Sequence, residues 1–309
     1  MNENRKLPLS GFALKLIAIL LMLVDHIGLF LSMYAGKAAN VEAAETASEI
    51  MRYIGRLSFP LFALLLAEGM RYSHNRVRYL LRLLGLYGLV TGVQLILAYT
   101  PNGLISGLDA VPSPITDLLF SALVLFCLLL KGAKKLYALL PIGFYLLCYG
   151  VGAYEVAKDV TVVWLPRLLR PAYSLFGLLT VLGFYYAFPL AYKMSKGMCQ
   201  SLGISEEIFP ETYQGRRLIN ILGCLFFFAA TAAFWGLSYV GNGFLDPVYN
   251  PLQPGITMSI QTYCLLSILF IYFYSGKRGY DSRKWRIASY SFFPVHIAVL
   301  YVVFYLIFM

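Results

Sequence analysis

The first long apolar run of the chain reads GFALKLIAILLMLVDHIGLFLSMY and extends from Gly11 to Tyr34. A helix that spans the hydrocarbon core of a bilayer needs about 20 mostly apolar residues, so this run predicts a transmembrane helix. The run is longer than the apolar part of a cleaved signal peptide. It also contains Lys15, Asp25 and His26 and is not followed by an Ala-x-Ala cleavage site. We therefore expect this helix to be retained.

Similar apolar runs recur along the whole chain. They lie at residues 54–72, 79–100, 115–131, 136–153, 172–193, 217–240, 256–275 and 287–308. Of the 309 residues, 60% are hydrophobic and 13% are charged, and the mean hydropathy is +0.71, which argues against a soluble domain. We predict an all-α fold, a polytopic membrane bundle of about nine transmembrane helices in a single domain over residues 1–309. A tenth span would arise if the Pro-broken segment 160–171 crossed the membrane.

Basic residues are concentrated in alternate loops. One set of loops contains Arg5, Lys6, Arg71, Arg76, Arg78, Arg82, Lys131, Lys134, Lys135, Lys193, Lys196, Arg216, Arg217, Lys277, Arg278, Arg283, Lys284 and Arg286. The other set has fewer, and its first loop, from about residue 36 to 49, carries three glutamates in a pattern that indicates a short amphipathic helix. Because cytoplasmic loops are enriched in Lys and Arg, we expect an integral membrane protein whose N-terminus and basic loops lie in the cytoplasm.

The net charge and the cysteines exclude two classes of function. The formal net charge is +10, but the basic residues are spread between spans, so we expect contacts with membrane lipids and none with nucleic acid. The five cysteines are scattered singly, without a Cys-x-x-Cys motif or a histidine at ligand spacing. We therefore predict no metal site.

Asp25 and His26 are adjacent ionisable residues inside the first predicted span. An aspartate at the centre of a transmembrane helix costs about 2.5–3.5 kcal/mol on insertion scales, so such residues usually face the protein interior. Neighbouring helical residues point about 100° apart, so these two side chains should face different elements. Arg56 lies at a similar depth in the second span and is the expected partner of Asp25. This pair either only fixes helix packing or orients a His26 that acts as a base.

Other polar residues add to this picture. His296 lies near the middle of the last span, and first and last helices of bundles often meet, so it is expected near His26; Glu68 closes the second span. His74 follows in a basic loop and is expected to be solvated. A phosphorylated cytosolic ligand or lipid headgroups would bind equally well to the basic side chains, which are Arg71, Arg76, Arg78, Lys277 and Arg278.

Several of these residues lie in motifs that together resemble the TraX family. The motifs are Leu14-Lys-Leu-Ile-Ala-Ile-Leu-Leu-Met-Leu-Val-Asp25-His26-Ile-Gly28, Ile54-Gly-Arg56-Leu-Ser-Phe-Pro60-Leu-Phe-Ala-Leu-Leu-Leu-Ala-Glu68-Gly69, Asn75-Arg76-Val-Arg-Tyr79-Leu-Leu-Arg82-Leu, Ser275-Gly-Lys277-Arg278-Gly279 and Phe293-Pro294-Val-His296. The resemblance implies a membrane acyltransferase related to the wider transmembrane acyltransferase group, with acetyl-CoA as the donor. The acceptor is left open between a peptide amine such as a pilin N-terminus, a glycan and a lipid.

The resemblance also implies roles for individual residues. His26 would be the catalytic histidine, and the supporting polar set would be Asp25, Arg56, Glu68 and His296. The CoA phosphates would be received by Arg71, Arg76, Arg78, Lys277 and Arg278. His26 would act either as a general base or through a covalent acetyl-histidine. Because His26 lies about 20 Å from the cytoplasmic side, this mechanism predicts a tunnel lined by His26, Arg56 and His296.

Two other classes of protein fit the same residues. A proton-coupled secondary transporter would use Asp25 and His26 as a proton relay, and it predicts internal repeats, which are not recognisable in the sequence. A structural scaffold predicts that replacing His26 affects only stability.

Overall fold

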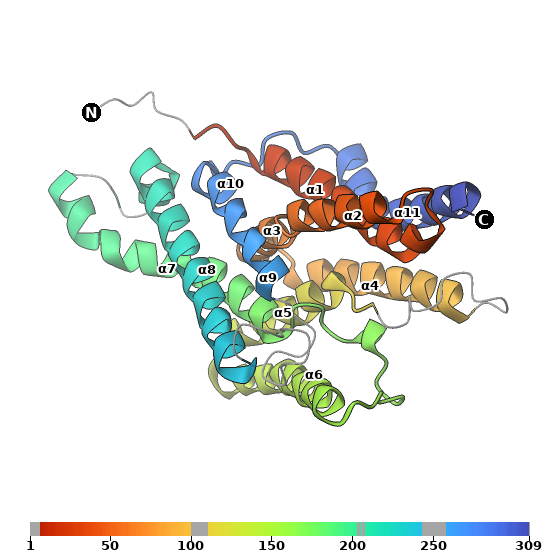
Figure 1. Ribbon diagram of the computed structural model, residues 1–309. Coiled ribbons are helices and arrows are strands. Elements are labelled where there is room, and N and C mark those ends of the chain that lie inside the picture. The colour runs from red at the N-terminus through yellow and green to blue at the C-terminus, as the bar shows by residue number, and fades with distance from the viewer. Residues whose placement is uncertain (1–6, 100–110, 203–204, 206–207, 243–257, 309) are drawn as a thin grey trace.

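The computed structural model describes residues 7–99, 111–202, 205, 208–242 and 258–308, which are almost entirely helical (Figure 1). The α-helices are α1 (Gly11–Tyr34), α2 (Val41–Gly55), α3 (Ser58–Tyr72), α4 (Arg76–Tyr99), α5 (Pro114–Leu128), α6 (Leu139–Lys158), α7 (Ser174–Leu202), α8 (Tyr213–Asn242), α9 (Met258–Gln261), α10 (Ile268–Tyr272) and α11 (Arg283–Phe308). Short 3-10 helices are η1 (Ala35–Lys37), η3 (Gly132–Ala138), η4 (Arg167–Leu169), η5 (Phe209–Glu211) and η8 (Thr262–Ser267).

The helices confirm the predicted fold class, a polytopic helical membrane protein. Within the described residues, seven helical segments are long and apolar enough to cross a membrane, and two shorter apolar helices lie at Pro114–Leu128 and Met258–Tyr272. These nine segments correspond in order to the nine predicted spans. Segment 160–171 contains a single 3-10 turn, so it does not form a tenth span. Arg5 and Lys6, which contributed to the predicted orientation, lie outside the described residues.

The second predicted span differs from the structure in its first part. Residues 41–72 form two helices, α2 and α3, which are separated at Arg56 and Leu57. Pro60 contributes to this break, because it has no amide hydrogen to donate to the carbonyl of Arg56. The amphipathic helix expected near residues 36–49 is therefore longer than predicted. It packs back along α1, with the Ser48 hydroxyl donating to the Gly28 carbonyl at 2.8 Å.

α3 lies at the centre of the bundle and contacts α1, α5 and α7. Its buried side chains include Phe59, Leu61, Leu66 and Met70, which point to different sides of the helix. A helix that is apolar on all sides is stable only when other elements surround it. The central position of α3 therefore brings its C-terminal residues, including Glu68, into the protein interior.

α11 lies beside α1, and Figure 1 shows the C-terminus close to the turn between α1 and α2. The contact is apolar near the C-terminal ends of the two helices, where the Phe30 and Phe304 rings are 5.7 Å apart. At the other end, the amides of Gly11 and Phe12 donate to the carbonyls of Lys277 and Arg278 at 2.7 and 2.9 Å. We call this end, where α1, α4 and α11 begin, the basic end of the bundle.

Candidate functional site

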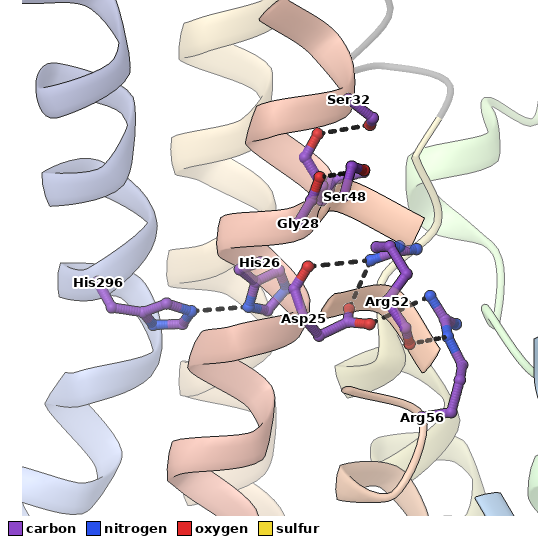
Figure 2. A network of polar contacts seen from close by, with 9 residues as sticks. Asp25, His26, Gly28, Ser32, Ser48, Arg52, Arg56 and His296 are labelled. Atoms are coloured by element: carbon purple, nitrogen blue, oxygen red, sulfur yellow. Dashed lines mark hydrogen bonds and ion pairs between the residues drawn. The ribbon is translucent and has the colours of Figure 1, made fainter. Parts of the chain in front are cut away.

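The site contains two histidines from the first and last helices. Nε2 of His296 lies 2.8 Å from Nδ1 of His26 (Figure 2), and Nδ1 of His296 lies 2.7 Å from the carbonyl oxygen of Phe292. A carbonyl oxygen only accepts hydrogen bonds, so Nδ1 of His296 carries a hydrogen. In the neutral rings, Nε2 of His296 is then the acceptor and Nδ1 of His26 is the donor. Nε2 of His26 keeps an unprotonated lone pair, as a general base requires.

Asp25 is held by two arginines of the neighbouring segment. Its carboxylate lies 2.5 Å from Arg52 and 3.2 Å from Arg56, and all three side chains are largely buried. The predicted contact between Asp25 and Arg56 is present. Arg52, which the sequence reading placed before the second span, is one helical turn from Arg56 and makes the shorter contact. The pattern Arg-x-x-x-Arg was the signal for this second partner, since residues four apart share a helix face.

Asp25 and His26 face different helices, as their adjacent positions predict. In Figure 2, Asp25 points toward Arg52 and Arg56, whereas His26 points toward His296 on α11. The approach of α2 to Asp25 depends on a glycine. A Cβ on Gly55 would lie 2.2 Å from the Cβ of Asp25, so a larger residue would push the two helices apart. The two residues therefore have separate partners.

A cavity of about 660 Å³ extends from the basic end to this site. It is lined at one end by Gly11 and Lys15, and at the other by Asp25, His26 and Gly55. It differs from the expected tunnel because Arg56 and His296 are absent from its lining. Arg56 is turned toward Asp25, and His296 lies behind His26 as its hydrogen-bond acceptor. Of the three residues expected to line the tunnel, His26 is therefore the one that lines the cavity.

Glu68 lines the same cavity and belongs to a second polar cluster. Its carboxylate lies 2.6 Å from Nη2 of Arg216 at the start of α8, and the Tyr274 hydroxyl donates to its other oxygen. Burial and the neighbouring Glu68 raise the pKa of the Tyr274 phenol, so it remains a donor. Gly276, with φ at +72°, leaves room for the Arg216 guanidinium. Sequence reasoning treated Arg216 only as a loop cation and missed this pair.

The five basic residues expected at the CoA phosphates do not form one group. Arg278 lines the cavity. Arg71 instead packs against the Tyr185 and Phe188 rings and donates to the Tyr185 carbonyl. Arg76 donates to the Met70 carbonyl at 3.0 Å. Arg78 and Lys277 are exposed and are not part of the cavity lining, and neither is His74, which is exposed as expected.

Metal ligands are not gathered at the site. Within the part of the chain that the structure describes, no group of three or more His, Cys, Asp or Glu side chains is placed to hold a metal ion. His26 and His296 are instead hydrogen-bonded to each other.

Known proteins provide an independent comparison. A family model described as TraX protein matches residues 10–304. The chain is 39% identical over 82 residues to the probable fimbrial assembly protein FimC, serogroup H1, of Dichelobacter nodosus. This match covers 26% of the chain and 30% of that relative, so it extends over less than a third of either protein. No solved structure matches the chain. Because the family model covers nearly all of the chain, the protein belongs to the TraX family, as the motifs around Asp25, Arg56 and His296 predicted.

Proposed function

We propose that the protein is a membrane acyltransferase that transfers the acetyl group of acetyl-CoA to an amine or hydroxyl acceptor. The observation that supports this function is the row of contacts from the Phe292 carbonyl through His296 to His26. In the neutral tautomers that this carbonyl requires, Nδ1–H of His26 donates to His296 and Nε2 of His26 is left as an unprotonated base. His26 also lines the inner end of the cavity, where a ligand entering from the basic end would reach it. Proton removal by a positioned histidine contributes about 10²–10⁴ in rate.

In the proposed reaction, Nε2 of His26 removes the proton of the acceptor N–H or O–H group. The acceptor atom forms a bond to the carbonyl carbon of the acetyl group, and the carbon–sulfur bond of the thioester breaks. The CoA thiolate leaves and takes up the proton from His26, so the side chain returns to its starting state. In a second variant, Nε2 itself carries the acetyl group between donor and acceptor.

The neighbours of His26 have distinct tasks in this proposal. His296 sets the orientation and tautomer of His26, because it accepts the Nδ1 hydrogen. Asp25 is engaged by Arg52 and Arg56 and holds α2 against the site. Glu68, paired with Arg216, shapes the cavity wall nearer the basic end.

The proposal includes an orientation in the membrane. The basic end is placed on the cytoplasmic side of a bacterial-type cytoplasmic membrane, in accord with its Lys and Arg content. Acetyl-CoA then enters from the cytosol. The acceptor is a peptide amine, a glycan or a lipid. We would test the N-terminal amine of a fimbrial subunit first, because a relative of part of this chain is named as a probable fimbrial assembly protein.

The experiment compares wild type with two histidine variants. The full chain is purified in detergent and given acetyl-CoA labelled in the acetyl group, and release of free CoA and transfer of label are followed. His26→Ala is expected to reduce both by at least about 100-fold, which is the low end of the contribution of a general base. His74→Ala is the matched control, because His74 is exposed and is not part of the cavity lining.

The outcomes separate the variants of the mechanism. Label that stays on the protein without an acceptor, and is lost in His26→Ala, indicates the acetyl-histidine route. Activity retained in His26→Ala overturns the proposed role of His26.

A proton-coupled transporter is the second candidate, because the contact between His26 and His296 also provides a path for a proton. It predicts proton-dependent substrate flux in proteoliposomes without acetyl-CoA.

A further inference from the structure

Cationic side chains gather where the cavity meets the basic end. The lining there includes Lys15 from α1, Arg82 from α4, Arg278 from the preceding loop and Arg286 from α11. Only Arg278 belongs to the set that the sequence predicted for phosphate binding. The four cations come from separate parts of the chain, and the fold brings them together at one opening.

Within the described residues, the carboxylate that pairs with these cations is that of Asp281, since Glu68 is engaged by Arg216. Asp281 also lines the cavity and lies 3.3 Å from Arg286 and 3.8 Å from Arg278. One carboxylate cannot balance four cations, so this end of the cavity keeps a net positive charge. Arginines present planar donors that match phosphate oxygens, so a phosphate-bearing group is the ligand chemistry that fits best.

Aromatic side chains stand next to the cations. The Phe12 ring lies 5.5 Å from the Tyr280 ring and 4.8 Å from the Trp285 ring, and all three residues line the cavity. Tyr280 is 62% exposed, so its ring is accessible to a ligand. Flat bases stack on aromatic rings with about 1–3 kcal/mol each. This pairing of cations with an exposed ring favours a nucleotide over a plain phosphate headgroup.

Beyond the cations the cavity becomes apolar. Its walls between the basic end and His26 include Ile19, Met22, Phe62, Leu65 and Leu83. Lys15 and His26 are 11 positions apart in α1, which corresponds to about 16 Å along the helix. The cavity thus suits a ligand with a charged head outside and a long, thin, uncharged arm reaching inward.

We propose that Lys15, Arg82, Arg278 and Arg286 bind the phosphates of CoA and that Tyr280 stacks on its base. This assignment rests on the proposed function, which supplies CoA as the donor. Of the set predicted from the sequence, it keeps Arg278 and replaces Arg71, Arg76, Arg78 and Lys277. A phospholipid shares the same chemistry of phosphate and long chain, so the experiment must separate the two sources.

The test measures binding without chemistry. The full chain is placed in nanodiscs of phosphatidylcholine, and the affinity for CoA, which has no acetyl group to transfer, is measured by calorimetry. Arg82→Gln and Arg286→Gln are each expected to weaken CoA binding about tenfold, which corresponds to about 1.4 kcal/mol. Arg283→Gln is the matched control, because Arg283 is an exposed arginine in the first turn of the same α11 and is not part of the cavity lining.

Two further ligands test the division of the cavity. Pantetheine lacks the phosphates and the base, so the same two variants should leave its weaker binding unchanged. Tyr280→Ala should weaken binding of CoA and of adenosine 3′,5′-bisphosphate but not of pantetheine.

Nanodiscs that contain phosphatidylglycerol test whether the site binds a lipid headgroup instead of CoA. If this lipid abolishes CoA binding to wild type and the loss is relieved in Arg82→Gln, the site takes a lipid headgroup and the inference is overturned.

The remaining outcomes are also decisive. Unchanged CoA affinity in both Arg82→Gln and Arg286→Gln, or an equal loss in Arg283→Gln, overturns the assignment. The assay is independent of acetyl transfer. CoA binding with the expected pattern in a protein that transfers no label would support this site while refuting the proposed function. Conversely, label transfer that is lost in His26→Ala, together with a CoA affinity that is unchanged in Arg82→Gln and Arg286→Gln, would support the proposed function while refuting this site.

Discussion

Asp25 and Glu155 are carboxylates that each contact two arginines, but they lie in different settings. Asp25 is on α1, contacts Arg52 and Arg56 at 2.5 and 3.2 Å, and lines the cavity. Glu155 is near the end of α6, outside the cavity lining, with a side chain 2% exposed against 17% for Asp25. The ion pairs alone therefore do not distinguish a site from a structural contact.

The groups around Glu155 are all directed at one another. Arg170 donates to both carboxylate oxygens at 2.8 Å and also to the Leu165 carbonyl, and the amide of Val162 donates to Glu155 at 2.8 Å. These bonds tie the loop after α6 to the helix. At Asp25, by contrast, the next residue is a histidine on a cavity wall. Asp25 therefore differs from Glu155 in its neighbour His26 and in the cavity beside it, and not in the carboxylate or its arginines.

The largest expected effect is on stability at Glu155. Glu155→Gln leaves the guanidinium of Arg170 without its counter-charge, and breaking such a buried pair costs about 3–5 kcal/mol. Chemical denaturation in detergent should detect this loss in the free energy of unfolding. Acetyl transfer per folded molecule should stay at the wild-type level. A loss of transfer in the folded fraction would contradict a purely structural role for Glu155.

The same change at Asp25 should mainly affect acetyl transfer. Asp25→Asn leaves Arg52 and Arg56 without an anionic partner, and their repulsion displaces α2 from the site. We expect the kcat of the proposed acetyl transfer to fall about 100-fold, because His26, the proposed general base, loses its contribution when its surroundings shift. The stability loss should be smaller than at Glu155, because these groups are more exposed.

Two measurements make this prediction specific. Asp25→Glu keeps the charge and should recover part of the lost kcat, whereas a protein that is merely misfolded would not respond to it. Size-exclusion profiles of the variants establish the folded fraction. Transfer that is unchanged in folded Asp25→Asn would support the first interpretation of the sequence, in which the pair only fixes helix packing.

The sequence predicted the parts of the site that depend on local spacing. Hydrophobic runs located the spans because a bilayer imposes a length on every crossing helix. The divergence of Asp25 from His26 followed from helix geometry alone. The proximity of His26 and His296 was expected from their depths in the first and last helices.

The parts that depend on tertiary packing were not predictable in the same way. Arg52 was not assigned to the site, because the pattern that indicated an amphipathic helix near residues 36–49 does not show that this helix continues to Gly55 and packs on α1. The pairing of Glu68 with Arg216 joins residues 148 positions apart, and the basic loops gave no indication of which arginine faces inward. Arg82 and Arg286 were counted only as basic loop residues and Lys15 only as a polar residue of the first span, until the cavity brought them together.

The packing of α2 on α1 provides a test of intermediate size. Gly55→Ala places a Cβ about 2.2 Å from the Cβ of Asp25, and overpacking of this kind costs about 1–3 kcal/mol. Both the unfolding free energy and acetyl transfer should fall. Gly88→Ala in α4 is the control, since nothing lies within 4 Å of its added Cβ and alanine favours the helix by about 0.5–1 kcal/mol. Equal behaviour of the two variants would show that the close approach at Asp25 is unimportant.

The smallest expected effect is at His296. His296→Phe keeps a ring of similar shape but removes the acceptor for Nδ1–H of His26. A hydrogen bond of this kind contributes about 0.5–1.5 kcal/mol, so kcat should fall by up to about tenfold while KM for acetyl-CoA stays the same. His296→Gln offers an amide oxygen as a new acceptor and should lose less.

The pH profile of kcat separates positioning from packing at His296. Without His296, the His26 ring keeps only its hydrogen bond to the Met22 backbone, its tautomer is less firmly fixed, and the acidic limb of the profile should shift relative to wild type. A variant that only loosens the bundle would lower kcat evenly at every pH. Because His296 orients His26 through a hydrogen bond and is not part of an ion pair, its replacement should affect the chemistry of His26 before it affects stability.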